Sequence, residues 1–462
     1  MKRFGATLAC AAALSALPTV ALAQDLLEVW RAAAQHDRRL VVARAEHAGS
    51  QALREQADAL WRPQLSASVG AGLGSSQSAM RGAQFSAPGM GTVDEARFAT
   101  SVNAGLATRA VLTAQQPLVN PARDAQRAQL RLGADMGDTA WRAAQTERML
   151  HTAERYLALA VAEERVRVLA RQAQALARAR TEAHDRYRMG SSPVTDTHEA
   201  DAALAAVQAQ QASAALQASV RRRALADSTG LAQPAARLPV RPLAPPGSEP
   251  AWVRAAEAGS PRLRLLGQAV DVAQQKLRQQ GAAGKPTVDL IAQAGYERIA
   301  GHGDFGSARN RSLNALVGVQ VNIPIDASGL LQAQEREAAE RLNQARAELD
   351  AAREEVTQQV HAAWLGLQAG ATGIAALEQG LAASAARRDA TRLGREVGDR
   401  TLMDVLHAEN DHAGAELALA QARSEQVMTR LKLAALADRL DEGLLAQVDA
   451  TLSAPPAQEP KP

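Results

Sequence analysis

Asp404, His407 and Asp411 are titratable residues whose spacing in this sequence could do chemistry together. They lie at i, i+3 and i+7, which places their side chains on one face of a helix. If several copies of the chain meet around a symmetry axis, each position becomes a ring of like groups, which raises the cost of ionising every copy and attracts cations. His407 would add pH dependence, because an imidazole titrates near about pH 6.5. The alternative is that all three are solvated surface residues.

Other chemical motifs in the sequence are incomplete, so an enzyme is not expected. His198 and Glu199 lack the second histidine of a zinc-binding helix, and His407 and His412 at i, i+5 splay apart. The glycine-rich stretch 70–72 follows a strand pattern but lacks the helix that a dinucleotide-binding turn requires. We find no localisable Ser/His/Asp arrangement. We therefore predict no catalytic residue, no metal site and no cofactor.

The stretch that carries Asp404 has a weaker copy earlier in the chain. Gly398 pairs with Gly190 and Asp404 with Asp196, both at an offset of 208 residues (398 − 190; 404 − 196). A glycine after a helical run is a common left-handed stop, and a polar residue shortly afterwards begins the next helix. Both stretches are predicted to be tight tips of antiparallel helical hairpins, with Gly190 and Gly398 at the turns.

The composition indicates a secreted helical protein without disulfides. Hydrophobic residues make up 47% of the chain but aromatic residues only 3%, so small residues, mainly alanine, would pack the helices closely. Residues 1–23 have the basic start, apolar run and Ala-Leu-Ala end of a secretory signal peptide. The single cysteine, Cys10, lies inside it; lipidation there is the less favoured alternative. Removing Lys2 and Arg3 takes the formal charge from +3 to about +1, which does not suggest a nucleic-acid partner.

Beyond the signal, the chain divides into two similar halves, 24–230 and 248–448, joined by a proline-rich linker at 231–247. The tail at 449–462 is expected to be disordered. Each half is predicted to contain a helix, two strands, a long helix, a tip and another helix. The expected first helices are 24–60 and 248–280, the strands about 64–73, 103–115, 287–296 and 312–323, the long helices 122–188 and 328–397, and the last helices 195–227 and 399–440. A longer loop is expected at about 75–94.

The predicted strands alternate apolar and polar side chains over about ten residues, which is the length of a tilted strand through a bilayer. In 312–323 the apolar residues run from Leu313 to Ile323 on one face, and only Leu316 interrupts the other face. A half-buried strand of a soluble protein has the same period, but four such strands on a secreted chain favour a membrane barrel. Four strands cannot close a barrel, and open edges in lipid leave backbone groups unpaired. Several chains must therefore share one barrel.

The two long helical runs indicate a second, coiled-coil part. At about 1.5 Å per residue each would be roughly 100 Å long. Apolar residues recur at heptad-like spacing, as at Leu406, Ala413, Leu417, Ala420, Val427 and Leu431, which is typical of helices that pack side by side. We expect no membrane-spanning helix, since no later run of about 20 apolar residues occurs.

These segments together resemble the TolC-like outer-membrane channel proteins of efflux pumps and type I secretion systems. The resemblance extends over nearly all of 24–448. The opening D-L-L-E-V-W-R-A-A-A from Asp25 is similar to the first helix of the family. Pro286 to Leu290, followed by V-Q-V-N-I-P-I-D-A-S-G at 319–329, resembles its second strand pair and exit turn. V-G-D-R-T-L-M-D-V-L-H-A at 397–408 is similar to the motif at its periplasmic tip.

The resemblance implies a homotrimer, with twelve strands in one outer-membrane barrel continued by a long α-helical periplasmic tunnel. The implied function is the exit duct of a tripartite efflux pump or type I secretion system in a Gram-negative bacterium. Its partners would be outer-membrane lipid, a periplasmic adaptor protein and an inner-membrane transporter, either an ABC transporter or a proton-driven pump. The alternative is a periplasmic coiled-coil adaptor or scaffold without a membrane barrel.

The resemblance also assigns roles to residues at the two tips. Asp404 and His407 fall on positions that ring the periplasmic entrance, and His407 stands where an aspartate is familiar. The positions that link the two hairpins and hold the entrance shut fall on Thr195, Asp196, Arg395 and Arg400. Arg395 stands where a tyrosine is familiar, so an ion pair with Asp196 could replace the usual hydrogen bond.

Overall fold

The computed structural model describes residues 25–452 apart from positions 90, 244 and 305. The predicted signal peptide with Cys10 and the end of the predicted tail lie outside the described residues. Within them the chain is mainly helical and contains a four-stranded sheet, as the sequence predicts. The described chain divides into two compact units, each of which takes segments from both sequence halves. We call 46–139 with 265–351 the sheet unit, and 25–45, 140–264 and 352–452 the tip unit.

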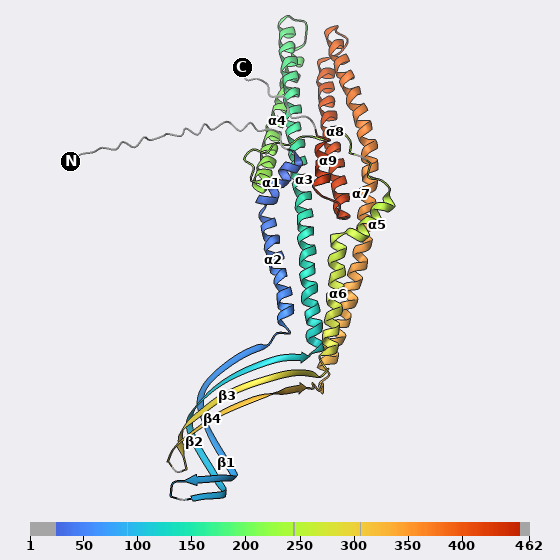
Figure 1. The fold of residues 1–462 in the computed structure, drawn as a ribbon. Helices are drawn as coiled ribbons and strands as arrows, with labels where there is room; N and C mark the ends of the chain where they lie inside the picture. The colour runs from blue at the N-terminus through green and yellow to red at the C-terminus, as the bar shows by residue number, and fades with distance from the viewer. Residues whose placement is uncertain (1–24, 90, 244, 305, 453–462) are drawn as a thin grey trace, which may run out of the picture. The chain divides into compact units, whose positions relative to one another are not determined.

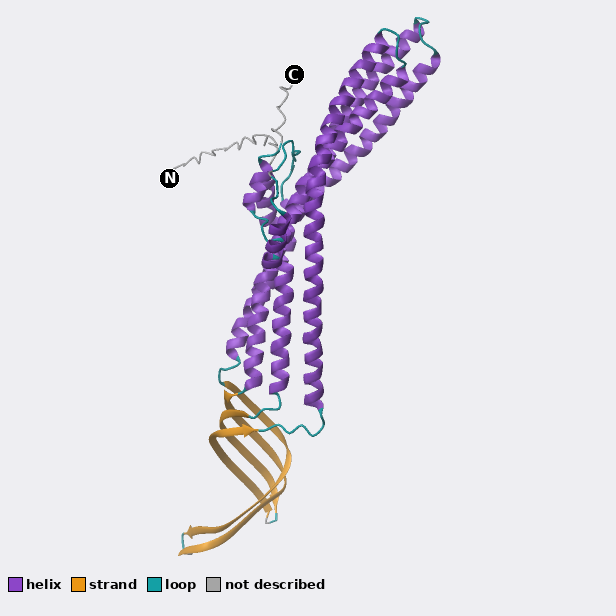
Figure 2. Cartoon of the chain, turned by 90° about the vertical axis from the view of Figure 1, so that its right-hand side faces the viewer, coloured by secondary structure: helices purple, strands orange, loops and turns teal. Residues whose placement is uncertain are grey.

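The sheet unit contains four antiparallel strands in the order in which they occur in the chain (Figure 1). They are β1 (Gln64–Ala87), β2 (Gly91–Val119), β3 (Thr287–Gly303) and β4 (Gly306–Asn322). Figure 2 shows them as one curved layer. Because β1 pairs only with β2, and β4 only with β3, one side of each of these two strands has no backbone partner within the described chain.

The loop expected at 75–94 is wrong, because β1 and β2 continue as a two-stranded ribbon. Their pairing extends from Ser76↔Val102 to Ala87↔Gly91, beyond the last β2–β3 pair at Ala104↔His302. Most described side chains of the ribbon are exposed. Because neither face is buried, its sequence needs no alternation of apolar and polar residues. The absence of that pattern made the ribbon look like a loop.

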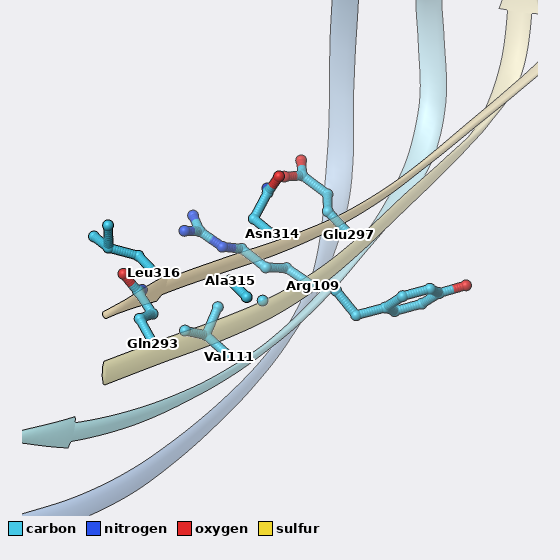
Figure 3. Close-up of a pocket in the computed structure, with 9 residues that line it drawn as sticks. Arg109, Val111, Gln293, Glu297, Asn314, Ala315 and Leu316 are labelled. Atoms are coloured by element: carbon cyan, nitrogen blue, oxygen red, sulfur yellow. The ribbon is translucent and has the colours of Figure 1, made fainter. Parts of the chain in front are cut away.

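The two faces of the sheet differ in polarity. The register places Val69, Ala110, Tyr296 and Leu313 in one row across the strands. On this apolar face the largest side chains are open to solvent in the single chain: Leu65 is 73% exposed, Val69 86%, Leu73 91%, Leu313 79% and Val317 75%. The opposite face is more polar and forms a shallow pocket lined by Arg109, Gln293, Glu297 and Asn314, among others (Figure 3). Leu316, the exception in the sequence pattern, also lines this pocket.

Each of the two expected first helices is broken in the structure. The first half has α1 (Leu26–His36) and α2 (Arg38–Ala59), separated at Asp37, whose backbone is extended and whose carboxylate accepts the N–H of Arg39 at 2.8 Å. The second half has α5 (Glu249–Gly259) and α6 (Pro261–Ala282). Pro261 explains the second break, because a proline disfavours helical backbone at the residue before it.

In the sheet unit, α2 packs closely on the start of α3 (Pro121–Arg188). A Cβ added to Gly137 would lie 1.9 Å from the Ser50 hydroxyl, so only glycine fits there. At the next residue, the Asp138 carboxylate accepts hydrogen bonds from Arg54 at 2.8 Å and Gln51 at 2.7 Å and contacts the His47 ring at 2.7 Å. The bonds from Arg54 and then His47 lower the pKa of Asp138 to about 2.

The tip unit has an apolar core formed by α1, α3, α4 (Val194–Thr229), α8 (Leu402–Leu436) and α9 (Glu442–Asp449). Fully buried members include Tyr156, Leu159, Leu225, Leu431 and Leu445. Asp449 caps α1 by accepting the N–H groups of Leu26 at 2.7 Å and Leu27 at 3.1 Å.

The described start of the predicted tail is ordered, contrary to the sequence expectation. The Thr451 carbonyl accepts the N–H of Val240 at 2.8 Å, and Leu452 is buried against the core. The linker therefore has a backbone partner, Pro239 pairing with Leu452, which local composition does not reveal. None of the helices in the described part of the chain has the length and apolarity needed to cross a membrane.

Candidate functional site

Two helical hairpins end in tight turns within the tip unit (Figure 1). The first joins α3 to α4 through Gly190, whose φ is 75°, and the second joins α7 (Leu330–Glu396) to α8 through Gly398, whose φ is 85°. In the first turn the backbone N–H of Ser191 donates to the carbonyl oxygen of Arg186 at 2.9 Å. In the second turn the backbone N–H of Asp399 donates to the carbonyl oxygen of Gly394 at 2.8 Å. Both bonds close a helix end on a left-handed residue, the conformation that glycine adopts without strain.

Asp404 has a structural task at the start of α8. Its carboxylate accepts the backbone N–H and the hydroxyl of Thr401, both at 2.9 Å, while its own N–H donates to the Thr401 hydroxyl at 3.2 Å. This reciprocal arrangement is a capping box. The bond from the Thr401 backbone N–H is the largest cause of a lowered pKa for Asp404. The carboxylate therefore stays ionised at neutral pH, and the pair fixes where α8 begins.

The other two residues on this helix face have different surroundings. His407 is exposed one turn after Asp404. Asp411 accepts a bond from Arg387 of α7 at 2.9 Å, and both side chains are about half exposed, at 49% and 61%. The structure thus separates the three predicted residues into a capping carboxylate, an open imidazole and a member of a surface ion pair.

A polar contact joins the second hairpin to the first. Arg395, near the end of α7, donates to Asp196 in the first turn of α4 at 3.0 Å, and the side chains are only 15% and 17% exposed. Ser192 also donates to Asp196, at 2.6 Å. The Arg395 Nε lies 4.0 Å from a carboxylate oxygen of Glu182 of α3. We call Glu182, Ser192, Asp196 and Arg395 the inter-hairpin cluster.

The other two predicted linking residues take no such part. Thr195 is exposed, and among the described residues we find no side-chain hydrogen bond for it. Arg400 bends back over its own hairpin, with its backbone N–H donating to Gly394 at 3.2 Å. Its side chain covers Gly394 so closely that a Cβ there would lie 2.7 Å from the Arg400 Cγ. Of the four positions, the structure brings together Asp196 and Arg395.

Further links between the hairpins escaped the sequence reasoning. Arg171 of α3 donates to Glu416 of α8 at 2.7 Å, and Gln172 donates to Asn410 of α8 at 3.4 Å. An apolar cluster also joins the two hairpins, formed by Leu169, Leu176, Ala183, Ala200, Val207, Ala214, Leu402 and Leu406. The partners in each link are more than 230 residues apart in the chain, so no local pattern could have paired them.

The second hairpin has its own buried charge. Glu409 of α8 is 7% exposed and forms an ion pair with Arg392 of α7. Such a carboxylate inside a coiled coil needs its partner, because an unpaired buried charge is strongly destabilising. Within the described residues, no group of three or more His, Cys, Asp or Glu side chains is arranged to hold a metal ion.

Part of the chain matches a known protein family, and the whole chain has relatives of known name. The family model for outer membrane efflux proteins matches residues 252–438. Outer membrane efflux protein BepC of Brucella suis is 36% identical over 177 residues, which is 38% of each chain. Alkaline protease secretion protein AprF of Pseudomonas aeruginosa is 28% identical over 68% of this chain and 66% of its own. Outer membrane protein TolC of Vibrio cholerae is 25% identical over 96% of this chain and 97% of its own.

The alignments thus span about two fifths of BepC and just under two thirds of AprF, but nearly all of the Vibrio cholerae protein. The fold agrees with that of the outer-membrane channel OprN, with a TM-score of 0.72 at 19% identity over 89% of both chains. The family match over residues 252–438, the BepC, AprF and TolC relatives and the fold shared with OprN support a TolC-like outer-membrane efflux protein, located in the Gram-negative outer membrane with a part in the periplasm.

Proposed function

We propose that the chain forms, as a homotrimer, the outer-membrane exit duct of a tripartite efflux pump or type I secretion system. One observation carries the proposal. A curved four-stranded sheet has an apolar face with leucines and valines 73–91% exposed, and its edge strands β1 and β4 lack partners on one side within the described chain. A sheet like this is unstable alone in either water or lipid.

The unpaired edges favour assembly over any single-chain arrangement. An unsatisfied backbone N–H or C=O in hydrocarbon costs several kcal/mol, so strands span membranes in closed barrels. Pairing β4 of one copy with β1 of the next closes the sheet. Three copies supply 3 × 4 = 12 strands, which exceeds the roughly eight strands needed to enclose a filled or open interior. The apolar face would then contact lipid and the polar face would line the lumen.

The long helices are proposed to continue this barrel as a periplasmic tunnel, closed at the hairpin tips. In this proposal the Asp196–Arg395 pair of the inter-hairpin cluster is the latch that holds the two hairpins of a protomer together. Because both side chains are poorly exposed, loss of either partner leaves a largely buried charge unpaired. Asp404 and His407 would form rings at the entrance, with Asp404 also holding the start of α8.

The cargo follows from the transporter that the duct serves. BepC is named for efflux and AprF for the secretion of alkaline protease, so relatives of this chain include both kinds of duct. We propose a periplasmic adaptor and an inner-membrane transporter, either ABC-type or proton-driven, as partners. The lumen-facing pocket residues Arg109 and Glu297 carry opposite charges, which does not select for one charge class of cargo.

Cell fractionation followed by channel recording tests the function. We expect the protein to stay in the outer membrane after a high-salt wash and to need detergent for extraction. In a planar bilayer it should give small, stable conductance steps that a salt-washed periplasmic scaffold would not give. Recovery of the protein in the washed periplasmic fraction, with no conductance, would favour a coiled-coil adaptor instead.

A further inference from the structure

A group of arginines lies on the apolar face of the sheet, at the end where β3 turns into β4. Arg298 of β3 stands directly opposite Arg311 of β4. Arg309 lies two residues before Arg311 in β4, on the same face of the sheet. All three side chains are exposed, as is that of His302, which shares their face on β3. We call Arg298, Arg309 and Arg311 the arginine cluster. Like charges directly opposite each other destabilise an antiparallel pair, so the cluster needs a neutralising partner.

The arginine cluster lies next to an uncharged part of the same face of the sheet. Leu313 lies two residues beyond Arg311 on the same face, and from Leu313 to Ile323 this face carries no charged residue. At about 3.3 Å per residue and a tilt of about 40°, that length spans roughly 25 Å, the height of the apolar band of an outer-membrane barrel. Tyr296, opposite Leu313, stands at this border, where aromatic residues are enriched.

No carboxylate of β3, β4 or the described part of the turn between them is available to the cluster. The two acids in β3, Asp289 and Glu297, lie an odd number of residues from Arg298 and so occupy the opposite face. Figure 3 shows Glu297 there, with Arg109 and Asn314. Asp304 in the turn is held by Ser101 at 2.7 Å and Asn103 at 2.6 Å, both of β2.

The neighbouring copy would not supply an acid from its adjacent strand either. On the proposed function, β4 pairs with β1 of the next protomer. That strand, QLSASVGAGLGSSQSAMRGAQFSA, contains no Asp or Glu. Within the described chain, no ion pair or side-chain hydrogen bond is found for any of the three arginines. Their charge is therefore left for a partner outside the protein, at the outer edge of the lipid-facing surface.

We infer that the arginine cluster binds the phosphate groups of the phosphorylated glycolipid that forms the outer leaflet of the outer membrane. The inference rests on the proposed barrel. In that barrel this face contacts lipid, and the loop between β3 and β4 lies on the extracellular side. A guanidinium donates two parallel hydrogen bonds to a phosphate and keeps its charge at every physiological pH. The uncharged surface beside the cluster would contact the acyl chains of the same molecule.

Lipid binding to the purified oligomer in detergent tests the inference. The probes are bis-phosphorylated lipid A, the same lipid without its phosphates, and inorganic phosphate. Wild-type protein should bind only the phosphorylated lipid tightly. Arg311→Gln should weaken this binding by about tenfold, the effect of losing one charge-assisted contact, and Arg298→Gln together with Arg311→Gln should weaken it further. Arg311→Lys keeps the positive charge but loses the paired N–H donors of the guanidinium. Its affinity for lipid A should therefore lie between those of wild type and Arg311→Gln.

The matched control is Arg109→Gln, which removes one positive charge at nearly the same height but on the opposite face. It should bind lipid A as wild type does. Equal binding by Arg311→Gln and Arg109→Gln, or equal binding of the dephosphorylated lipid, would overturn the inference. Competition by inorganic phosphate at the concentrations at which lipid A binds would show a free-anion site and also overturn it. A protein that is monomeric without detergent would defeat the barrel itself, a separate failure visible before any lipid is added.

Discussion

The tip unit holds its helices together in two contrasting ways. Around α1 and α9 the helices pack on a buried apolar core, with Tyr156, Leu431 and Leu445 fully buried. Toward the turns the two hairpins meet through the polar inter-hairpin cluster and a smaller apolar cluster that includes Leu176, Leu402 and Leu406. Dispersion and hydrophobic contacts in a packed core have one good arrangement, whereas an ion pair can separate and be replaced by water at modest cost. The core around α1 and α9 is therefore suited to keep its helices together, whereas the hairpins can separate at their tips.

Leu431→Ala should have the largest effect on stability, because it creates a cavity in the fully buried core. We expect a loss of about 2–5 kcal/mol, seen as a lower midpoint of thermal unfolding by circular dichroism. Leu431→Met preserves the volume and should cost less than about 1.5 kcal/mol. Similar midpoints for the two variants would show that this region is not a packed core.

Asp196→Ala should have a smaller effect on stability but the larger effect on conduction. It leaves the poorly exposed Arg395 guanidinium without its partner, at a cost of about 1–3 kcal/mol. If the pair is the latch, single-channel conductance should rise, since the hairpins of each protomer can separate at the tip.

The control for this variant is Asp411→Ala. It breaks the exposed pair with Arg387, which joins α7 to α8 inside one hairpin, and such pairs contribute about 0–1 kcal/mol. Conductance should stay at the wild-type value. If Asp196→Ala also leaves conductance unchanged, the inter-hairpin cluster does not hold the channel shut.

Acid should loosen the start of α8 only at low pH. The folded-state pKa of Asp404 lies below its ordinary value of 3.8, so the capping box contributes stability above about pH 4 and loses it as pH falls through the lowered pKa. Hydrogen exchange should show the first amides of α8 protected at neutral pH and less protected near about pH 3. Thr401→Ala should expose them at both values. Equal protection across this range in wild type would mean that the cap does not depend on the carboxylate.

His407 should give the smallest effect, confined to ion block. His407→Asp adds a negative charge close to Asp404 at each proposed entrance position and should strengthen block by multivalent cations. Conductance with such a cation should therefore be lower for His407→Asp than for wild type at the same pH. Equal block of the two proteins would refute the idea.

The amino-acid pattern located the strands best where one face is apolar. Leu313 to Val321 alternate with polar residues, and the register puts them on one exposed face. The pattern failed in the ribbon at 75–101, where most described side chains are exposed and no buried face selects an alternation. The break before Pro261 could have been read from the proline, whereas the stop at Asp37 has no comparable local signal.

The site was predictable in part for a similar reason. The matched tips suggested that Asp196 and Arg395 meet, and they lie 3.0 Å apart. The direction of Arg400 depends on the path of one turn, and the Arg171–Glu416 pair depends on how two distant helices align. The capping role of Asp404 could have been predicted from Thr401 three residues earlier, because the two positions have the spacing of a capping box.

In the proposed channel, β1 and β4 find their missing partners on other copies of the chain, and every other property of the duct depends on this pairing. Static light scattering of the detergent-extracted protein, corrected for bound detergent, measures it most directly. We expect a mass of three chains that falls to one only on heating in denaturing detergent. A single chain that remains soluble and folded without detergent would contradict the shared barrel.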